Sequence, residues 1–139
     1  MASIRKQILT SASPAAVWSA IRDIGALHTR LVPGFVVDTR LEPGVRIVTF
    51  ANGMTAREII VTIDDEAMRL VWSARSERLS HHNGAVQVFS NADSQTTVVW
   101  SADLLPDEMA GPIGLMMDQG MLAMKTALDG LVNKVQARP

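Results

Sequence analysis

The last third of the chain carries one long apolar stripe, and this stripe limits the folds open to the rest. After Leu105-Pro106-Asp107, apolar side chains recur every three or four residues, the spacing of one face of an α-helix. The stripe consists of Met109, Ile113, Met117, Met121, Met124, Leu128, Val132 and Val135. Such a face needs an apolar partner. Gly111-Pro112 and Gly114 predict a kink or a short separate turn before the helix proper.

The middle of the chain supplies that partner as strands. From Phe35 to Leu104, β-branched segments alternate with turn-forming groups such as Glu42-Pro43-Gly44, which predicts six strands with hairpin-sized connections. Ahead of them, Ile4 to Thr10 predicts a first strand. An antiparallel sheet with one long helix across it is an α+β arrangement. We therefore expect a curved seven-stranded antiparallel sheet wrapped around a long C-terminal helix.

Two short helices are expected between the first and second strands. Ser13 can cap a helix whose first-turn Pro14 has no N–H to lose. Gly25 is predicted to end this helix, and Ala26 to Leu31 predicts one or two further turns.

Composition narrows the class of protein. The 139 residues fit one domain over 1–139, and 47% hydrophobic with 19% charged residues is ordinary globular usage. A formal net charge of −1 gives no basic field for nucleic acid, which we do not expect as a partner. No apolar run approaches the roughly 18 residues of a membrane span, and the start MASIRKQIL lacks the apolar segment of a secretion signal, so we expect a cytoplasmic protein.

The chain contains no cysteine, which excludes disulfides, zinc-thiolate sites and a thiol nucleophile. It also lacks a glycine-rich phosphate loop of the GxGxxG or GxxxxGK type. We expect neither a cofactor nor a metal. The sequence leaves the oligomeric state open, with a homodimer as one alternative.

The order of elements and several short motifs resemble the START-like helix-grip superfamily, which includes the SRPBCC and polyketide cyclase/dehydrase proteins. The matching motifs are Ser13 to Trp18 before Ile21-Arg22-Asp23, Glu42 to Arg46, Arg57-Glu58 leading into Ile63-Asp64-Asp65, and Trp100 to Pro106. The resemblance covers nearly the whole chain and implies side chains that fill a core or line a cavity between sheet and helix. The superfamily includes cyclases, lipid carriers and hormone receptors, so the resemblance alone does not select an activity.

Within the superfamily, VWSAIRDI from Val17 and REIIVTIDDE from Arg57 also resemble the plant abscisic-acid receptors. That resemblance implies that Glu58 lines the pocket, that Leu70, Trp72 and Ala74 point inward, and that Asn83 lies near a pocket position. The chain departs from the receptors in two places. The position of the receptors' pocket lysine corresponds to a position near Leu31, so the ion pair that holds a carboxylate ligand is absent. Their gate loop is replaced by the shorter Asn52-Gly53-Met54.

Glu58 is the main candidate for chemistry. On the predicted strand Thr55 to Ile63 it shares a face with Ile60 and Thr62, and the opposite face is similarly apolar. Solvent-facing and inward orientations therefore both stay open. A carboxylate inside an apolar cavity would have a raised pKa unless it is hydrogen-bonded, and could then serve as a general acid or base or as a ligand anchor.

The three histidines are His28 and the adjacent pair His81 and His82. Neighbouring side chains of a strand point to opposite faces, so only one of the pair can enter a cavity. We predict that His81 points inward with Asn83 while His82 faces water, although a partly exposed polar role for each stays open. His28, Glu58 and His81 would form a two-histidine, one-carboxylate metal set. Only composition suggests that set, so we disfavour it.

The last predicted strand, Thr96 to Leu104, places Ser101 and Asp103 on one face and Trp100 on the other. The sequence does not decide which face is inward. We prefer Asp103 as a residue that caps or orients the entry to the long helix.

The leading functional hypothesis is a binding module for a small, largely hydrophobic ligand. Flexible methionine side chains on the last helix suit a varied apolar cavity, although core packing explains them equally well. The predicted ligand-binding residues are His28, Glu58, Ile60, Trp72, His81, Asn83, Ser101, Met117, Met121 and Met124. The alternative is a cyclase/dehydrase-like enzyme in which Glu58 or His81 moves a proton. A filled core without a ligand is the third reading.

Overall fold

The computed structural model describes the backbone of residues 1–136, and side chains as far as residue 132. Val135, the last member of the predicted stripe, lies outside the described side chains. Seven antiparallel strands form one sheet in the order β1-β7-β6-β5-β4-β3-β2. The strands are β1 (Ala2–Thr10), β2 (Val36–Glu42), β3 (Val45–Phe50), β4 (Thr55–Asp64), β5 (Arg69–Arg75), β6 (His81–Ser90) and β7 (Thr96–Leu105). The expected α+β fold is confirmed.

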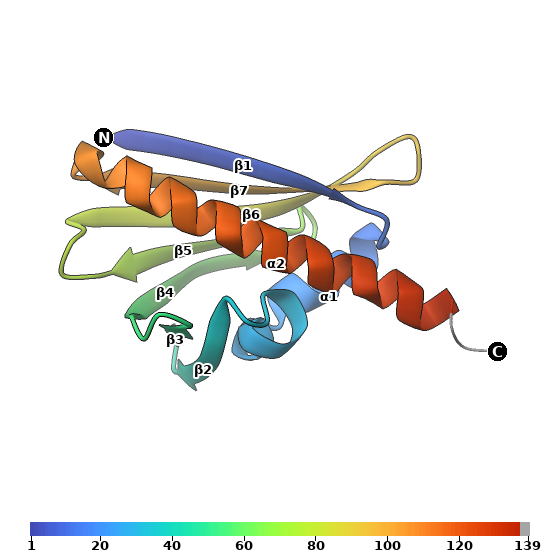
Figure 1. Cartoon of the computed structure of the whole chain (residues 1–139), viewed down its shortest axis with the longest axis horizontal. Helices are drawn as coiled ribbons and strands as arrows, with labels where there is room; N and C mark the ends of the chain where they lie inside the picture. The colour runs from blue at the N-terminus through green and yellow to red at the C-terminus, as the bar shows by residue number, and fades with distance from the viewer. Residues whose placement is uncertain (137–139) are drawn as a thin grey trace.

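The long helix α2 (Ala110–Gln136) lies across one face of the sheet and packs along β1 (Figure 1). The predicted interruption near its start is a short 3-10 turn at Asp107–Met109, and α2 then continues through Gly111-Pro112 and Gly114. Proline is tolerated here because the first turn of a helix has no intrahelical partner for its N–H. Within the stripe, Met117, Met121, Met124 and Leu128 are buried.

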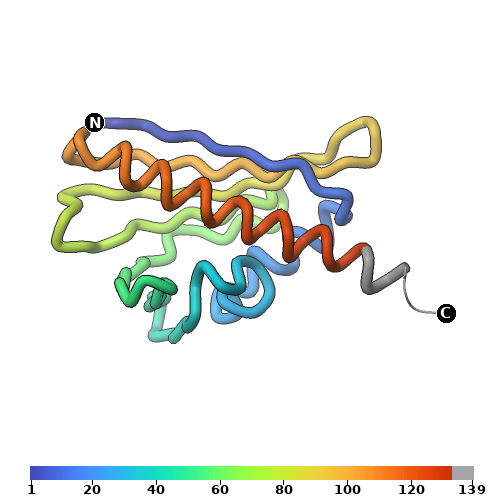
Figure 2. The backbone as a smooth tube through the Cα atoms, viewed as in Figure 1, coloured from blue at the N-terminus to red at the C-terminus, as the bar shows by residue number. Residues whose placement is uncertain are grey.

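The helical segment between β1 and β2 begins as predicted and ends earlier. Helix α1 (Pro14–Arg22) is capped by Ser13, whose Oγ accepts a hydrogen bond from the Ala16 N–H at 3.2 Å. The helix stops at Arg22 rather than at Gly25, and a 3-10 turn (Ile24–Ala26) and a π-helical turn (Leu27–Leu31) follow. The π-helical turn contacts both α2 and β2, and Figure 2 shows this helical segment beside the middle of α2.

The inner face of the sheet is set by strand parity. On β6 the even-numbered Val86 and Val88 are buried, and on β7 the even-numbered Val98, Ala102 and Leu104 are buried. Asp103 therefore lies on the exposed outer face, where its carboxylate accepts a hydrogen bond from Ser3 Oγ. The preferred capping role is wrong, because Pro106 occupies the N-cap position ahead of the helical turn and provides no side-chain hydrogen bond.

Strand β4 changes parity along its length. Its register with β5 shifts between Ile60 and Thr62, which marks a bulge. Before the bulge Glu58 is buried and Ile59 is exposed, and after it Ile63 packs against the core. The bulge thus turns Ile63 toward the core, whereas Ile59 and Val61 stay exposed.

No helix among the described residues is long and apolar enough to cross a membrane.

Candidate functional site

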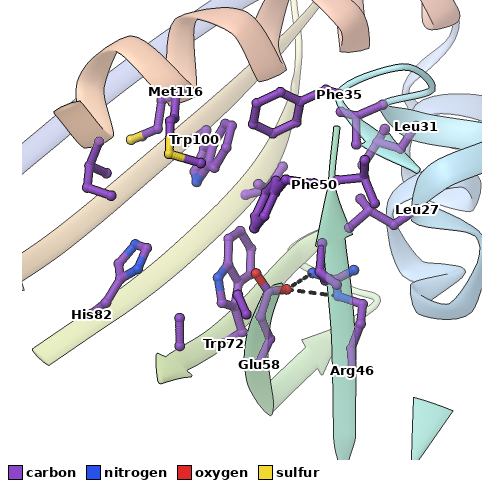
Figure 3. A pocket seen from close by; sticks show the side chains of 18 of the residues that line it. Leu27, Leu31, Phe35, Arg46, Phe50, Glu58, Trp72, His82, Trp100 and Met116 are labelled. Atoms are coloured by element: carbon purple, nitrogen blue, oxygen red, sulfur yellow. Dashed lines mark hydrogen bonds and ion pairs between the residues drawn. The ribbon is translucent and has the colours of Figure 1, made fainter. Parts of the chain in front are cut away.

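A cavity of about 120 Å³ lies between the inner face of the sheet and α2. Its walls are largely apolar and come from α1 and the helical segment after it, from β2 to β7, and from α2. Phe35 and Phe50 meet edge to face with ring centroids 5.4 Å apart, and Trp72 and Trp100 pack at a tilt with centroids 6.4 Å apart. Figure 3 shows these four rings around the open space.

Two glycines allow the aromatic walls to approach this closely. The Trp72 indole lies directly on Gly84 of β6, where an added Cβ would fall 2.4 Å from a ring atom. On α2, an added Cβ at Gly120 would come within 2.8 Å of the Trp100 ring and 3.1 Å of the Phe35 ring. The absence of side chains at these positions therefore brings a strand and a helix into contact with the rings that shape the cavity.

A buried ion pair forms one side of the cavity. Arg46 on β3 and Glu58 on β4 are directly opposite in the strand register. Arg46 donates two hydrogen bonds to the same oxygen, Glu58 Oε1, at 2.9 Å from Nε and 2.7 Å from Nη2. The side chains are 3% and 10% exposed, and the guanidinium carbon lies 5.7 Å from the centroid of the Trp72 ring. The second carboxylate oxygen, Oε2, has no hydrogen-bond partner among the described residues.

His82 and Trp100 form the polar part of the other side. Buried His82 Nε2 and Trp100 Nε1 have no hydrogen-bond partner within the described part of the chain. Burial lowers the pKa of the His82 imidazole below its ordinary value of 6.5, and the neighbouring His81 lowers the pKa further. The ring is therefore neutral at pH 7, with one nitrogen that donates and one that accepts. Figure 3 shows His82 and Trp100 on one side of Trp72 and the ion pair on the other.

The family model for polyketide cyclase/dehydrase and lipid transport proteins matches residues 1–136. The chain belongs to this family. None of the curated proteins matches the chain.

Solved structures of other proteins share this fold. The protein XoxI from Bacillus cereus is 21% identical with a TM-score of 0.81, over 92% of this chain and 96% of its own. An uncharacterised protein from Bacillus thuringiensis is 20% identical with a TM-score of 0.81, over 91% and 98%. A START superfamily protein from Mycobacterium smegmatis is 11% identical with a TM-score of 0.68, over 96% and 98%. At these identities the likeness establishes the fold.

Four of the predicted ligand-binding residues line the cavity of this protein. They are Glu58, Trp72, Met117 and Met124. Leu70 and Ala74 also line it, as the receptor resemblance implied. The inward reading of Glu58 is thus the one that the structure adopts, with a cationic partner that was not predicted.

The predicted facing of the histidine pair is reversed. His82 lines the cavity, whereas His81 lies on the opposite face of β6 with exposed Asn83. The physical reason is strand parity, since His82 shares its face with buried Val86 and Val88, and His81 shares its face with Gln87. An inward role for His81 and Asn83 is therefore excluded by their position.

The other predicted residues lie outside the cavity lining. His28 Nδ1 lies 3.0 Å from Thr39 Oγ1. Ile60 packs against the core, Met121 is buried within it, and Ser101 lies on the outer face of β7. In the described residues no group of three histidine or acidic side chains could hold a metal ion, and the disfavoured set of His28, Glu58 and His81 is not brought together.

Sequence reasoning missed Arg46 and left Trp100 undecided. Arg46 alternates with Val48 and Phe50 along β3, which places a charge on an otherwise apolar face. That pattern, together with a hairpin register opposite Glu58, is the signal that could have found the pair. For Trp100, its shared parity with Val98 and Ala102 marks the inward face.

Proposed function

We propose that the protein binds a small, largely hydrophobic ligand in the cavity between the sheet and α2. The observation that carries this proposal is an aromatic-lined apolar cavity of about 120 Å³ that also contains a few polar groups. Ligand sites combine a mostly apolar lining with a small number of placed polar groups that fix orientation. Membership of a family that includes lipid transport proteins agrees with this reading.

The energetic argument points the same way. At about 24 cal/mol per Å³, an apolar cavity of about 120 Å³ costs roughly 3 kcal/mol of folding free energy. That is a large fraction of the 5–15 kcal/mol by which domains are stable. A chain that only needed a core would gain by filling this space, so its retention supports a binding role. Met117 and Met124 add walls that can adapt to the outline of the ligand.

A cavity-filling variant tests the binding function. Ala74 lines the cavity on β5, and Ala74→Leu places a larger side chain into the space. We expect this variant to lose affinity for co-purified or added apolar ligands while remaining folded. Ala85→Leu on the outer face of β6 is the matched control and should bind as the parent does.

The measurements are native mass spectrometry of the purified protein and thermal shifts with a panel of lipids and aromatic metabolites. Equal ligand binding by Ala74→Leu and the parent protein would contradict the cavity as the site. A parent protein that co-purifies with no small molecule and shows no shift with any panel member would contradict the binding function itself.

An enzyme of the cyclase/dehydrase kind is the second candidate, and His82 is the observation that favours it. A neutral imidazole with an unpartnered nitrogen inside a ligand cavity can accept a proton from a bound substrate. This role moves from His81 to His82, because His82 is the histidine that lines the cavity. Glu58 is the other candidate for proton transfer, although Arg46 already binds one of its oxygens.

Substitution of His82 separates the two candidates. The best-binding panel member is incubated with the protein, and the mixture is analysed by chromatography and mass spectrometry. An enzyme converts the compound, and His82→Gln loses turnover while binding is largely kept. A carrier returns the compound unchanged, and the variant loses affinity alone.

The finer resemblance to the abscisic-acid receptors stays a prediction. Glu58 and Trp72 line the cavity, as that resemblance implies. The outward position of Asn83 does not support it.

A further inference from the structure

The cavity distributes its polar groups in a way that selects among ligand chemistries, and the inference drawn from this rests on the proposed binding function. Its charged groups are one guanidinium and one carboxylate, Arg46 and Glu58, in direct contact at 2.7 Å. The pair is formally neutral. A ligand therefore meets no uncompensated charge on this side of the cavity.

An ionised ligand would bind weakly beside this pair. A ligand carboxylate that approached Arg46 would compete with Glu58 and would meet its free oxygen, Oε2. A ligand ammonium group that approached Glu58 would meet the Arg46 guanidinium. Either ion would also lose its hydration among aromatic and aliphatic side chains, which costs several kcal/mol unless a partner compensates the charge.

The other side of the cavity offers neutral hydrogen-bonding groups. His82 on β6 and Trp100 on β7 come from adjacent strands, with Trp100 paired to Val86, four residues from His82. An indole N–H can only donate, so Trp100 Nε1 requires an acceptor atom. A neutral imidazole nitrogen either donates to a carbonyl oxygen or accepts from a hydroxyl group. An unmade hydrogen bond at a buried group is costly, and a ligand oxygen can remove that cost.

We propose that the ligand is an uncharged molecule with an apolar, ring-sized body and an oxygen function, ketone or hydroxyl, that accepts a hydrogen bond from Trp100 Nε1 on the His82 side of the cavity. The apolar body then lies against Trp72, Phe35 and Phe50. Free fatty acids and amines are excluded as preferred ligands by the neutral ion pair.

A series of probes on one carbon skeleton tests this selection by isothermal titration calorimetry at pH 7.5. The probes are naphthalene, 2-acetylnaphthalene, 2-naphthoate and 2-(aminomethyl)naphthalene, of which the last two are charged at this pH. We expect the ketone to bind roughly fivefold more tightly than the hydrocarbon, from one hydrogen bond. The carboxylate and the ammonium probe should each bind at least about tenfold more weakly than the ketone.

Trp100→Phe removes the proposed donor and keeps an aromatic ring. It should abolish the preference for ketone over hydrocarbon while naphthalene binding changes less. Trp18→Phe is the matched control, because the Trp18 Nε1 donates to Asp65 away from the cavity, at 2.9 Å. This control should keep the ketone preference. Circular dichroism melts verify that both variants are folded. If Trp100→Phe does not fold, the series on the parent protein still tests the neutral ligand class, and equal affinity for the ketone and naphthalene would still overturn the proposed hydrogen bond.

The outcomes separate the inference from the binding function. Tighter binding of 2-naphthoate or of the ammonium probe than of the ketone would overturn the neutral class while binding stands. Equal affinity for the ketone and naphthalene, or a ketone preference unchanged in Trp100→Phe, would overturn the role of the Trp100 N–H. If no probe binds, the hydrocarbon included, the inference and the proposed binding in this cavity fail together for ring-sized ligands.

Discussion

Removal of Arg46 should destabilise the protein far more than removal of any surface arginine. Arg46→Met keeps most of the side-chain volume and leaves the Glu58 carboxylate 10% exposed and without its cation. Two unit charges about 4 Å apart attract by about 4 kcal/mol at an effective dielectric constant of 20. Taking each ion out of water costs several kcal/mol, so the intact pair is close to neutral for stability. Loss of one partner leaves that cost uncompensated.

The expected loss for Arg46→Met is about 3–5 kcal/mol in the free energy of unfolding. Glu58→Leu should cost a similar amount, because it leaves a buried guanidinium. The double variant should recover most of the loss and lie within about 2 kcal/mol of the parent. Urea titration followed by tryptophan fluorescence measures all three, since Trp72 lies beside Arg46.

Arg57 on the same strand as Glu58 provides the matched control. Arg57 donates to Glu42 at 3.3 Å with side chains 51% and 40% exposed, so Arg57→Met should cost at most about 1 kcal/mol. A loss below about 1 kcal/mol for Arg46→Met would refute the reasoning. So would a double variant whose loss equals the sum of the single losses.

Three further predictions concern the cavity walls and pH. Gly84→Ala should lower the free energy of unfolding by about 1–3 kcal/mol in urea titrations, because the new methyl group meets the Trp72 ring. Gly120→Ala should lower the thermal midpoint despite its better helix propensity, because Trp100 and Phe35 block the methyl group, whereas Gly114→Ala on the same helix has open space and should raise it. Stability should fall as the pH drops from about 6.5 through the lowered folded-state pKa of His82, because the unfolded chain then binds more protons. Chemical denaturation between pH 5 and 8 should show this slope reduced in His82→Leu, and an identical slope in that variant would contradict the assignment.

The fold followed from local patterns because several signals agreed. The apolar stripe on α2, the Ser13-Pro14 start of α1 and the turn-forming groups between strands all indicated the same order of elements. The end of α1 was harder to predict from the sequence, because a 3-10 turn and a π-helical turn follow it.

The site was predicted less completely because it depends on register. On β4 both faces look apolar because Ile59 and Val61 are exposed, and the bulge between Ile60 and Thr62 changes which residues point inward. The pairing of Arg46 with Glu58 depends on the alignment of β3 with β4, which alternation within one strand cannot supply. The histidine pair was assigned from its nearest neighbours, whereas the buried valines further along β6 set its parity.

Several residues both line the cavity and belong to the hydrophobic core. Val36, Val48, Leu70 and Val86 belong to both. A substitution at these residues that adapts the cavity to another ligand therefore also changes the free energy of unfolding. A ligand at 100 times its Kd adds about 2.7 kcal/mol of stability, close to the roughly 3 kcal/mol that the open space costs. Evolution toward a new specificity is consequently easiest where the old ligand, or its successor, is abundant enough to support the fold during the change.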